Sequence, residues 1–135
     1  MARFLDTNIL LRHLVREDEQ KASACRALLL RVERGEETVV ATDVVIFEVV
    51  YILQSPRHYG VSRDGIRQML EPLINLRGLR LPDKSLYTRA FDLYCGSKIS
   101  FADAYNAAYM ESRGLTEITA TMPTPTSTGS KGYGG

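Results

Sequence analysis

Short apolar runs alternate with helical patterns along most of this chain, and this alternation limits the folds that it can form. A helical pattern here means apolar residues that recur three or four positions apart. The runs at 3–5, 38–41, 79–81 and 115–118 are predicted to be strands, and helical segments separate them. Strands joined by helices pair in parallel within one sheet. The sequence therefore predicts an α/β sandwich, a parallel sheet with helices on both faces.

Capping residues help to place the helices. We expect helices over residues 7–16, 18–34, 44–55, 62–78, 83–96 and 100–114. Thr42 or Asp43 can cap the third of them, and Pro72 lies within the fourth and can kink it. The third helix carries apolar residues on nearly every side, so we expect it to be buried.

Composition indicates one globular domain. The chain has 135 residues, of which 44% are apolar, enough for a single core. The apolar run before Asp6 is too short for a signal peptide, and no run is long enough to span a membrane. We therefore expect a cytoplasmic protein with no membrane partner. Cys25 and Cys95 lie in predicted helices without a second ligand at metal spacing, so we expect free thiols.

Charge gives little information about partners. The formal net charge is only +1, so it does not by itself indicate a nucleic-acid ligand. Residues 57–89 are moderately basic, which suits phosphate contacts and equally suits a solvated helical surface.

Glu48 is the most informative single residue, because it stands among apolar neighbours in the third helix. A buried carboxylate costs several kcal/mol unless it is paired or binds a metal. No Lys or Arg lies at helical spacing to pair with it. A buried ion pair with a more distant residue remains the alternative to a functional role.

Asp6 and Asp103 lie at predicted helix starts. Asp6 ends the first strand, and parallel sheets gather ligands at the carboxyl ends of their strands. The alternative is that it caps the helix that follows. Asp103 stands three residues after Ser100, where a first-turn acid is also favoured by the helix dipole.

The three acids together suggest a metal site. Carboxylates that converge repel one another and take up protons unless a cation lies between them. Their hard oxygen atoms suit Mg²⁺ or Mn²⁺. An ion held in this way commonly serves phosphate chemistry.

Three stretches carry a resemblance to a known family. The segments FLDTNIL, FEVVYIL and ISFADAYNAAYM, in this order, resemble the signatures of PIN-domain nucleases. More narrowly, they resemble the VapC-like toxins of VapBC-type toxin–antitoxin pairs. The resemblance runs from Arg3 to about Ile118. It implies a three-layer α/β/α sandwich, Mg²⁺- or Mn²⁺-dependent cleavage of single-stranded RNA, a small antitoxin partner and a homodimer.

The resemblance also implies roles for single residues. Three acids match the catalytic, metal-binding positions of the family: Asp6, Glu48 and Asp103. Three polar residues match positions that can contact the substrate: Thr7, Asn8 and Ser100.

The end of the chain departs from the family pattern, which continues with a further cluster of acids and a last strand. Residues 119–135 contain no acid. If one base were lost after the Ile118 codon, the tail codons would permit YSYDADTDFDRVEGVRR in the original frame, which resembles the family ending. A vector-derived or naturally divergent tail is the alternative. We therefore expect a PIN-like domain over 1–118, without its last edge strand, and an irregular tail over 119–135.

The sequence is compatible with two functions from different classes. The first is an endoribonuclease toxin that the altered tail weakens. The second is an inactive PIN-fold remnant that still binds an antitoxin or a dimer partner. A receiver domain or a phosphatase is disfavoured, because LDTN provides no second acid beside Asp6.

Overall fold

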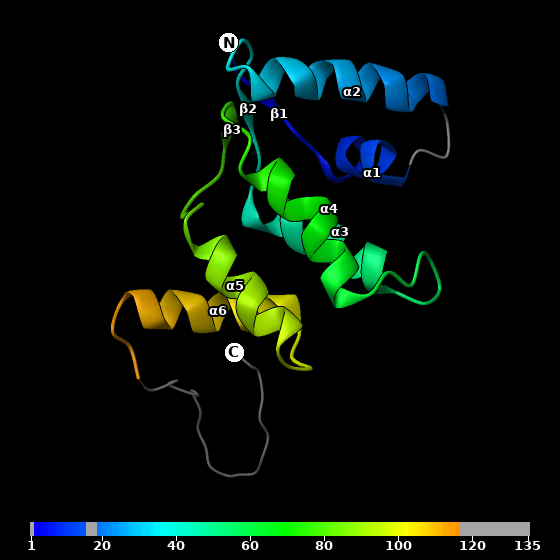
Figure 1. Ribbon diagram of the computed structural model, residues 1–135. Coiled ribbons are helices and arrows are strands. Elements are labelled where there is room, and N and C mark those ends of the chain that lie inside the picture. The colour runs from blue at the N-terminus through cyan, green and yellow to red at the C-terminus, as the bar shows by residue number, and fades with distance from the viewer. Residues whose placement is uncertain (1, 16–18, 117–135) are drawn as a thin grey trace.

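The computed structural model describes residues 2–15 and 19–116 (Figure 1). In that part of the chain, helices alternate with three short strands. The elements are β1 (Arg3–Phe4), α1 (Thr7–Val15), α2 (Glu19–Glu33), β2 (Val39–Val40), α3 (Asp43–Gln54), α4 (Arg63–Ile74), β3 (Leu79–Arg80), α5 (Leu86–Cys95) and α6 (Phe101–Ser112).

The three strands form one parallel sheet in the order β1-β2-β3. Arg3 pairs with Val39, and Val39 pairs with Leu79. Because the strands run in the same direction, their carboxyl ends lie at one edge of the sheet, and Asp6 follows the first of them. The predicted α/β class with a parallel sheet is confirmed.

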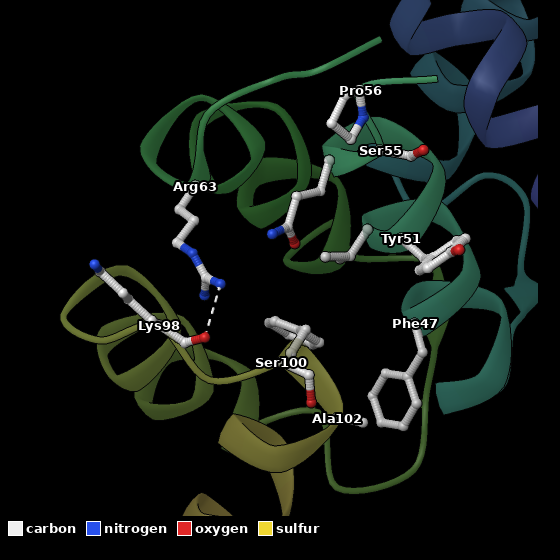
Figure 2. Close-up of a pocket in the computed structure, with 11 residues that line it drawn as sticks. Phe47, Tyr51, Ser55, Pro56, Arg63, Lys98, Ser100 and Ala102 are labelled. Carbon is white, nitrogen blue, oxygen red and sulfur yellow. Dashed lines mark hydrogen bonds between the residues drawn. The ribbon is translucent and has the colours of Figure 1, made fainter. Parts of the chain in front are cut away.

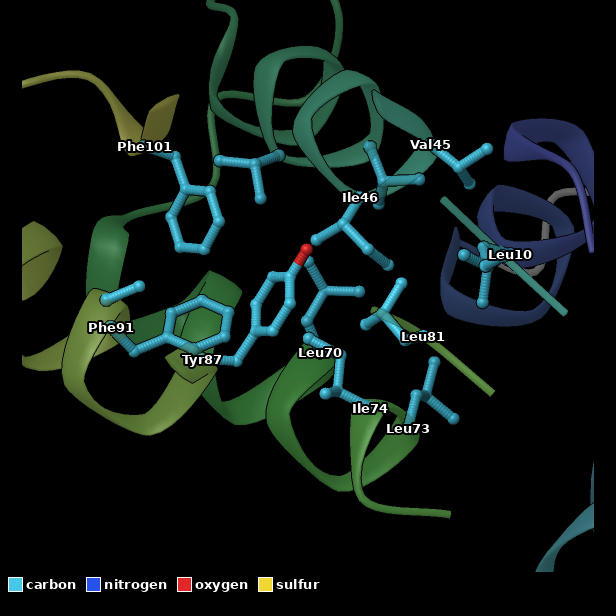
Figure 3. Close-up of a cluster of buried hydrophobic side chains, with 14 of the residues drawn as sticks. Leu10, Val45, Ile46, Leu70, Leu73, Ile74, Leu81, Tyr87, Phe91 and Phe101 are labelled. Carbon is cyan, nitrogen blue, oxygen red and sulfur yellow. The ribbon is translucent and has the colours of Figure 1, made fainter. Parts of the chain in front are cut away.

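The helices surround one continuous core. Figure 1 shows α1 beside α2 near the strands and α5 beside α6 at the other end, with α3 and α4 between them. Figure 3 shows Leu10, Ile46, Leu70 and Tyr87 converging from α1, α3, α4 and α5. Each of these four side chains is at most 2% exposed, so the elements that carry the site residues share one packed interior.

Three helices are preceded by hydroxyl residues that cap them. The side chains of Thr42, Ser62 and Ser100 each accept a hydrogen bond from a backbone N–H in the first turn of the helix that follows. Thr42, rather than Asp43, is therefore the cap of α3. Pro72 lies in the last turn of α4, and the helix continues to Ile74.

Two expectations about elements need correction. The third helix is not buried all round, because Val44 is 62% exposed, Tyr51 is 71% exposed and Glu48 is also exposed. Its apolar residues outnumber those that the core can cover. Of the predicted fourth strand, Leu115 and Thr116 lie in no strand. Residues 117 and 118 lie outside the described residues, and so does the expected irregular tail at 119–135.

Two further expectations concern cysteines and membranes. Cys25 and Cys95 are free thiols, as predicted. None of the described helices is long and apolar enough to cross a membrane.

Candidate active site

Asp6 stands between the end of β1 and the start of α1. Its Oδ1 atom accepts a hydrogen bond from the backbone N–H of Ile9 at 3.0 Å. The alternative role as a helix cap is therefore present in the structure. The Asp6 side chain is nevertheless exposed, so a ligand can still reach it. Asn8, the predicted polar neighbour, is exposed in the first turn of α1.

Thr7 and Glu48 come together from distant parts of the chain. The Thr7 hydroxyl donates a hydrogen bond to Glu48 Oε1 at 2.7 Å, which joins the start of α1 to the middle of α3. The expectation that Glu48 is buried is wrong, because the core-facing side of α3 is formed by other residues, such as Val45 and Val49. The desolvation argument for Glu48 therefore fails, and its contact with Thr7 is the better reason to consider it functional.

Ser100 and Asp103 lie together at the start of α6. The Ser100 hydroxyl oxygen accepts a hydrogen bond from the backbone N–H of Asp103 at 3.0 Å. The Asp103 carboxylate is exposed. Ser100 thus has a structural role as a cap, and it fixes the helical turn that presents Asp103 to solvent.

Arg63 holds the loop that leads into this turn. Its guanidinium donates hydrogen bonds to the carbonyl oxygens of Tyr94, Ile99 and Lys98 at 3.0, 2.6 and 3.2 Å. The same group lies 4.3 Å from the centre of the Tyr94 ring, within range of a cation–π contact. Arg63, the first residue of α4, therefore ties the α5–α6 loop to α4 and positions Ser100.

An aromatic cluster joins α3 to α6. The ring of Phe47 meets the rings of Phe101 and Tyr105 edge-on, with centroids 5.8 and 5.4 Å apart. Phe47 directly precedes Glu48, and the other two rings lie two residues on either side of Asp103. The helices that carry these two acids are therefore in direct contact.

The three acids do not form a preassembled metal site in the described part of the chain. Within residues 2–15 and 19–116, no group of three or more His, Cys, Asp or Glu side chains is arranged to hold a metal ion. The donor chemistry does fit, because Asp6, Glu48 and Asp103 offer exposed carboxylate oxygens to a hard cation. Mg²⁺ usually takes only one or two carboxylates from a protein and keeps several waters. Two carboxylates are thus enough in number for such an ion.

Asp43 is a structurally important acid that sequence reasoning treated only as a possible cap. It accepts hydrogen bonds from the hydroxyl groups of Tyr87 at 2.5 Å and Tyr105 at 3.0 Å. Asp43 therefore connects the start of α3 to both α5 and α6. Its position just after a strand, like that of Asp6, is the signal that was available in the sequence.

The two tyrosines that donate hydrogen bonds to Asp43 should make the free energy of unfolding depend on pH in the alkaline range. Burial, and then the Asp43 carboxylate, raise the pKa of both Tyr87 and Tyr105. An unfolded tyrosine ionises near pH 10, so above about pH 10 the unfolded chain loses protons that the folded chain keeps. The free energy of unfolding should therefore be insensitive to these groups below about pH 9 and should fall above about pH 10.

Urea unfolding between pH 8 and 11 checks this expectation, with tyrosinate absorbance as a second readout. Tyr87→Phe removes one of the two groups and should make the alkaline decline shallower. An equally steep decline in Tyr87→Phe would contradict a contribution from this group.

The family of this chain follows from its similarity to known proteins. The profile of the PIN domain matches residues 3–120, which include all of the predicted site residues. The chain belongs to the PIN domain family. It is also similar to a VapC ribonuclease of Aquifex aeolicus (strain VF5), with 26% identity over 116 residues, 86% of this chain and 84% of that protein. The family recognised from the three short motifs is thus confirmed.

Proposed function

We propose that this PIN domain is a Mg²⁺- or Mn²⁺-dependent endoribonuclease that cleaves single-stranded RNA in the cytoplasm, as the toxin of a toxin–antitoxin pair. The observation that carries the proposal is the hydrogen bond from Thr7 to Glu48. It joins two of the three family motifs, which are 41 residues apart. The similarity to a VapC ribonuclease supports the choice of RNA as substrate and of a small antitoxin as partner. A homodimer is part of the same proposal.

The acidic residues are proposed to bind the metal ion. Asp6, Glu48 and Asp103 would hold the divalent ion, which when bound supplies a Lewis acid to the phosphodiester group. Thr7 holds one oxygen of Glu48 through its hydroxyl, so the second oxygen is presented in a fixed direction.

Neutral polar groups are proposed to position the RNA substrate. The amide of Asn8 is exposed next to Asp6 and can donate to a phosphate oxygen. Ser100 sets the orientation of the turn that carries Asp103. An exposed carboxylate among the three acids can accept the proton released when water attacks phosphorus. The P–O bond to the leaving ribose oxygen breaks in the same displacement, and that oxygen takes up a proton from solvent.

The proposal is tested by incubating the purified chain with a mixed pool of single-stranded RNA in millimolar Mg²⁺ or Mn²⁺. Slow cleavage that EDTA abolishes is the expected result. Cleavage that persists in EDTA would point to a contaminating nuclease or a metal-independent mechanism, and would contradict the proposal.

The absence of acids from residues 119–135 favours a second candidate, the inactive remnant. A matched chain that ends in YSYDADTDFDRVEGVRR separates the two candidates. The toxin proposal expects measurable cleavage by the present chain and a gain on the order of 10²-fold in the matched chain, because a further acidic ligand would be restored. Cleavage by the matched chain alone would identify the present chain as the remnant.

A further inference from the structure

A pocket of about 690 Å³ opens next to the candidate active site. One wall comes from α3 and the segment after it, and the other comes from Arg63 and the loop that leads into α6. Ser100 and Ala102 lie between the walls (Figure 2), and Phe101 also lines the pocket. Pockets of 300–1,000 Å³ accommodate small organic ligands, so the space is sufficient for one nucleotide.

The pocket lies directly beside the residues proposed to act on RNA. Phe47 in its lining precedes Glu48, and Ala102 precedes Asp103. Ser100 belongs both to the lining and to the cap of the turn that presents Asp103. A nucleotide in the pocket would therefore lie next to a phosphate held at the acids.

The charge of the lining suits a polyanion. Arg63 and Lys98 line the pocket, and no acid is among the described residues that do so. Figure 2 shows both basic side chains on the side opposite Phe47 and Tyr51. The Arg63 guanidinium is engaged by backbone carbonyls but keeps its charge. Lys98 is exposed and is available to pair with a phosphate at the rim.

The opposite wall offers a surface for a base. Tyr51 is 71% exposed, an unusual position for an aromatic residue in a helix whose other face is buried. Single-stranded nucleic acids are commonly bound where bases stack on aromatic rings and basic side chains follow the backbone. Tyr51 and Lys98 provide one group of each kind on opposite sides of a single pocket.

Gln54 adds a directed hydrogen-bond donor. The Tyr94 hydroxyl donates to Gln54 Oε1 at 2.5 Å, which fixes the orientation of the side-chain amide. The amide nitrogen is left with donor capacity, and no described atom accepts a hydrogen bond from it. Because Gln54 lines the pocket, this nitrogen can donate to an acceptor on the edge of a base.

From these observations we infer that the pocket is a nucleotide subsite for the residue of single-stranded RNA next to the scissile phosphate. Tyr51 stacks on the base, Gln54 donates to the base edge, and Lys98 pairs with the adjoining phosphate. This inference rests on the proposed function and adds to it the position and the chemistry of substrate contact.

Equilibrium binding in EDTA tests the subsite separately from cleavage. A fluorescein-labelled, mixed-sequence RNA of about ten nucleotides is titrated with the full chain, and fluorescence anisotropy reports the affinity. Tyr51→Ala should weaken binding about tenfold, because one stacked base is lost, whereas Tyr51→Phe keeps the ring and should bind normally. Lys98→Gln should reduce the slope of log affinity against log salt concentration by about 0.7, the value for one phosphate of a single strand.

Two control variants match these changes away from the pocket. Tyr109→Ala removes a tyrosine that is 37% exposed on α6, and Arg34→Gln removes an exposed charge after α2. Neither residue lines the pocket, so both variants should bind as the unmodified chain does. Melting temperatures check that every variant is folded.

The outcomes separate the subsite from the cleavage reaction. Failure of the unmodified chain to bind RNA, or normal binding by Tyr51→Ala together with an unchanged salt slope for Lys98→Gln, would overturn the subsite. A change in self-association by Tyr51→Ala, without a change in RNA affinity, would assign the surface to a protein contact and would also overturn it. If the expected losses occur but the unmodified chain cleaves nothing in Mg²⁺ or Mn²⁺, the subsite stands and the proposed reaction fails.

Discussion

Asp6→Asn is expected to reduce metal-dependent RNA cleavage by about 10²-fold or more while leaving the fold intact. The change removes the charge of one proposed metal ligand, and a loss of about 3 kcal/mol in transition-state stabilisation corresponds to roughly 10²-fold in rate. The cap on α1 should survive, because Oδ1 of Asn can still accept the hydrogen bond that Ile9 N–H now donates to Asp6. Initial cleavage rates and melting temperatures of the two proteins measure both effects.

A second substitution at the same position separates the cap from the reaction. Asp6→Ala loses both the charge and the cap, so it should be as inactive as Asp6→Asn and less stable by about 1 kcal/mol. Glu19→Gln, at an exposed first-turn acid of α2, serves as the charge control and should retain cleavage. Unfolding of Asp6→Asn would assign Asp6 to the fold, and full activity would exclude it from the site.

Local signals were sufficient to predict most of the elements. Each of the described strands was visible as a short run with apolar residues, although only β2 is apolar at both positions, while both residues of β1 and Arg80 of β3 are exposed. The starts of α3, α4 and α6 were visible because hydroxyl caps act within three residues of sequence. Such short-range interactions can be read without knowledge of the tertiary structure.

The exposure of the Glu48 side chain could not be predicted in the same way. The apolar composition of α3 indicated a helix covered on all sides, yet Val44 and Tyr51 are largely exposed. Whether a given side of a helix is covered depends on the neighbouring elements and not on the helix itself. Composition therefore predicted that α3 packs on the core, but it wrongly predicted that the core covers every side of the helix, including the side that carries Glu48.

For a related reason, the contacts of the site could not be predicted from residues that are neighbours in the sequence. Thr7 and Glu48 are separated by 41 residues, and Asp43 is separated from Tyr87 and Tyr105 by 44 and 62. Motif resemblance selected Glu48 because the family pattern includes it. Asp43 falls outside the three motif segments that were compared, so only the folded structure reveals its partners.

Asp43→Ala is expected to produce the largest loss of stability, about 3 kcal/mol in the free energy of unfolding. The Tyr87 hydroxyl belongs to a side chain that is 1% exposed, and Tyr105 is 7% exposed. Removing their shared acceptor leaves two phenol groups without the bonds that they donate, and a buried donor without a partner costs about 1–3 kcal/mol. The melting temperature should fall by roughly 10 °C, as measured by circular dichroism.

The same substitution should also slow cleavage, because Asp43 connects α3, which carries Glu48, to α6, which carries Asp103. Asp64→Ala is the matched control, since Asp64 is an exposed first-turn acid of α4 and its loss should cost well under 1 kcal/mol. Tyr105→Phe removes only one of the two bonds and should fall between these two variants. Equal stability of Asp43→Ala and Asp64→Ala would show that the two hydroxyl groups find other partners, and that packing such as the contacts of Phe47 with Phe101 and Tyr105 is sufficient to join α3 to α6.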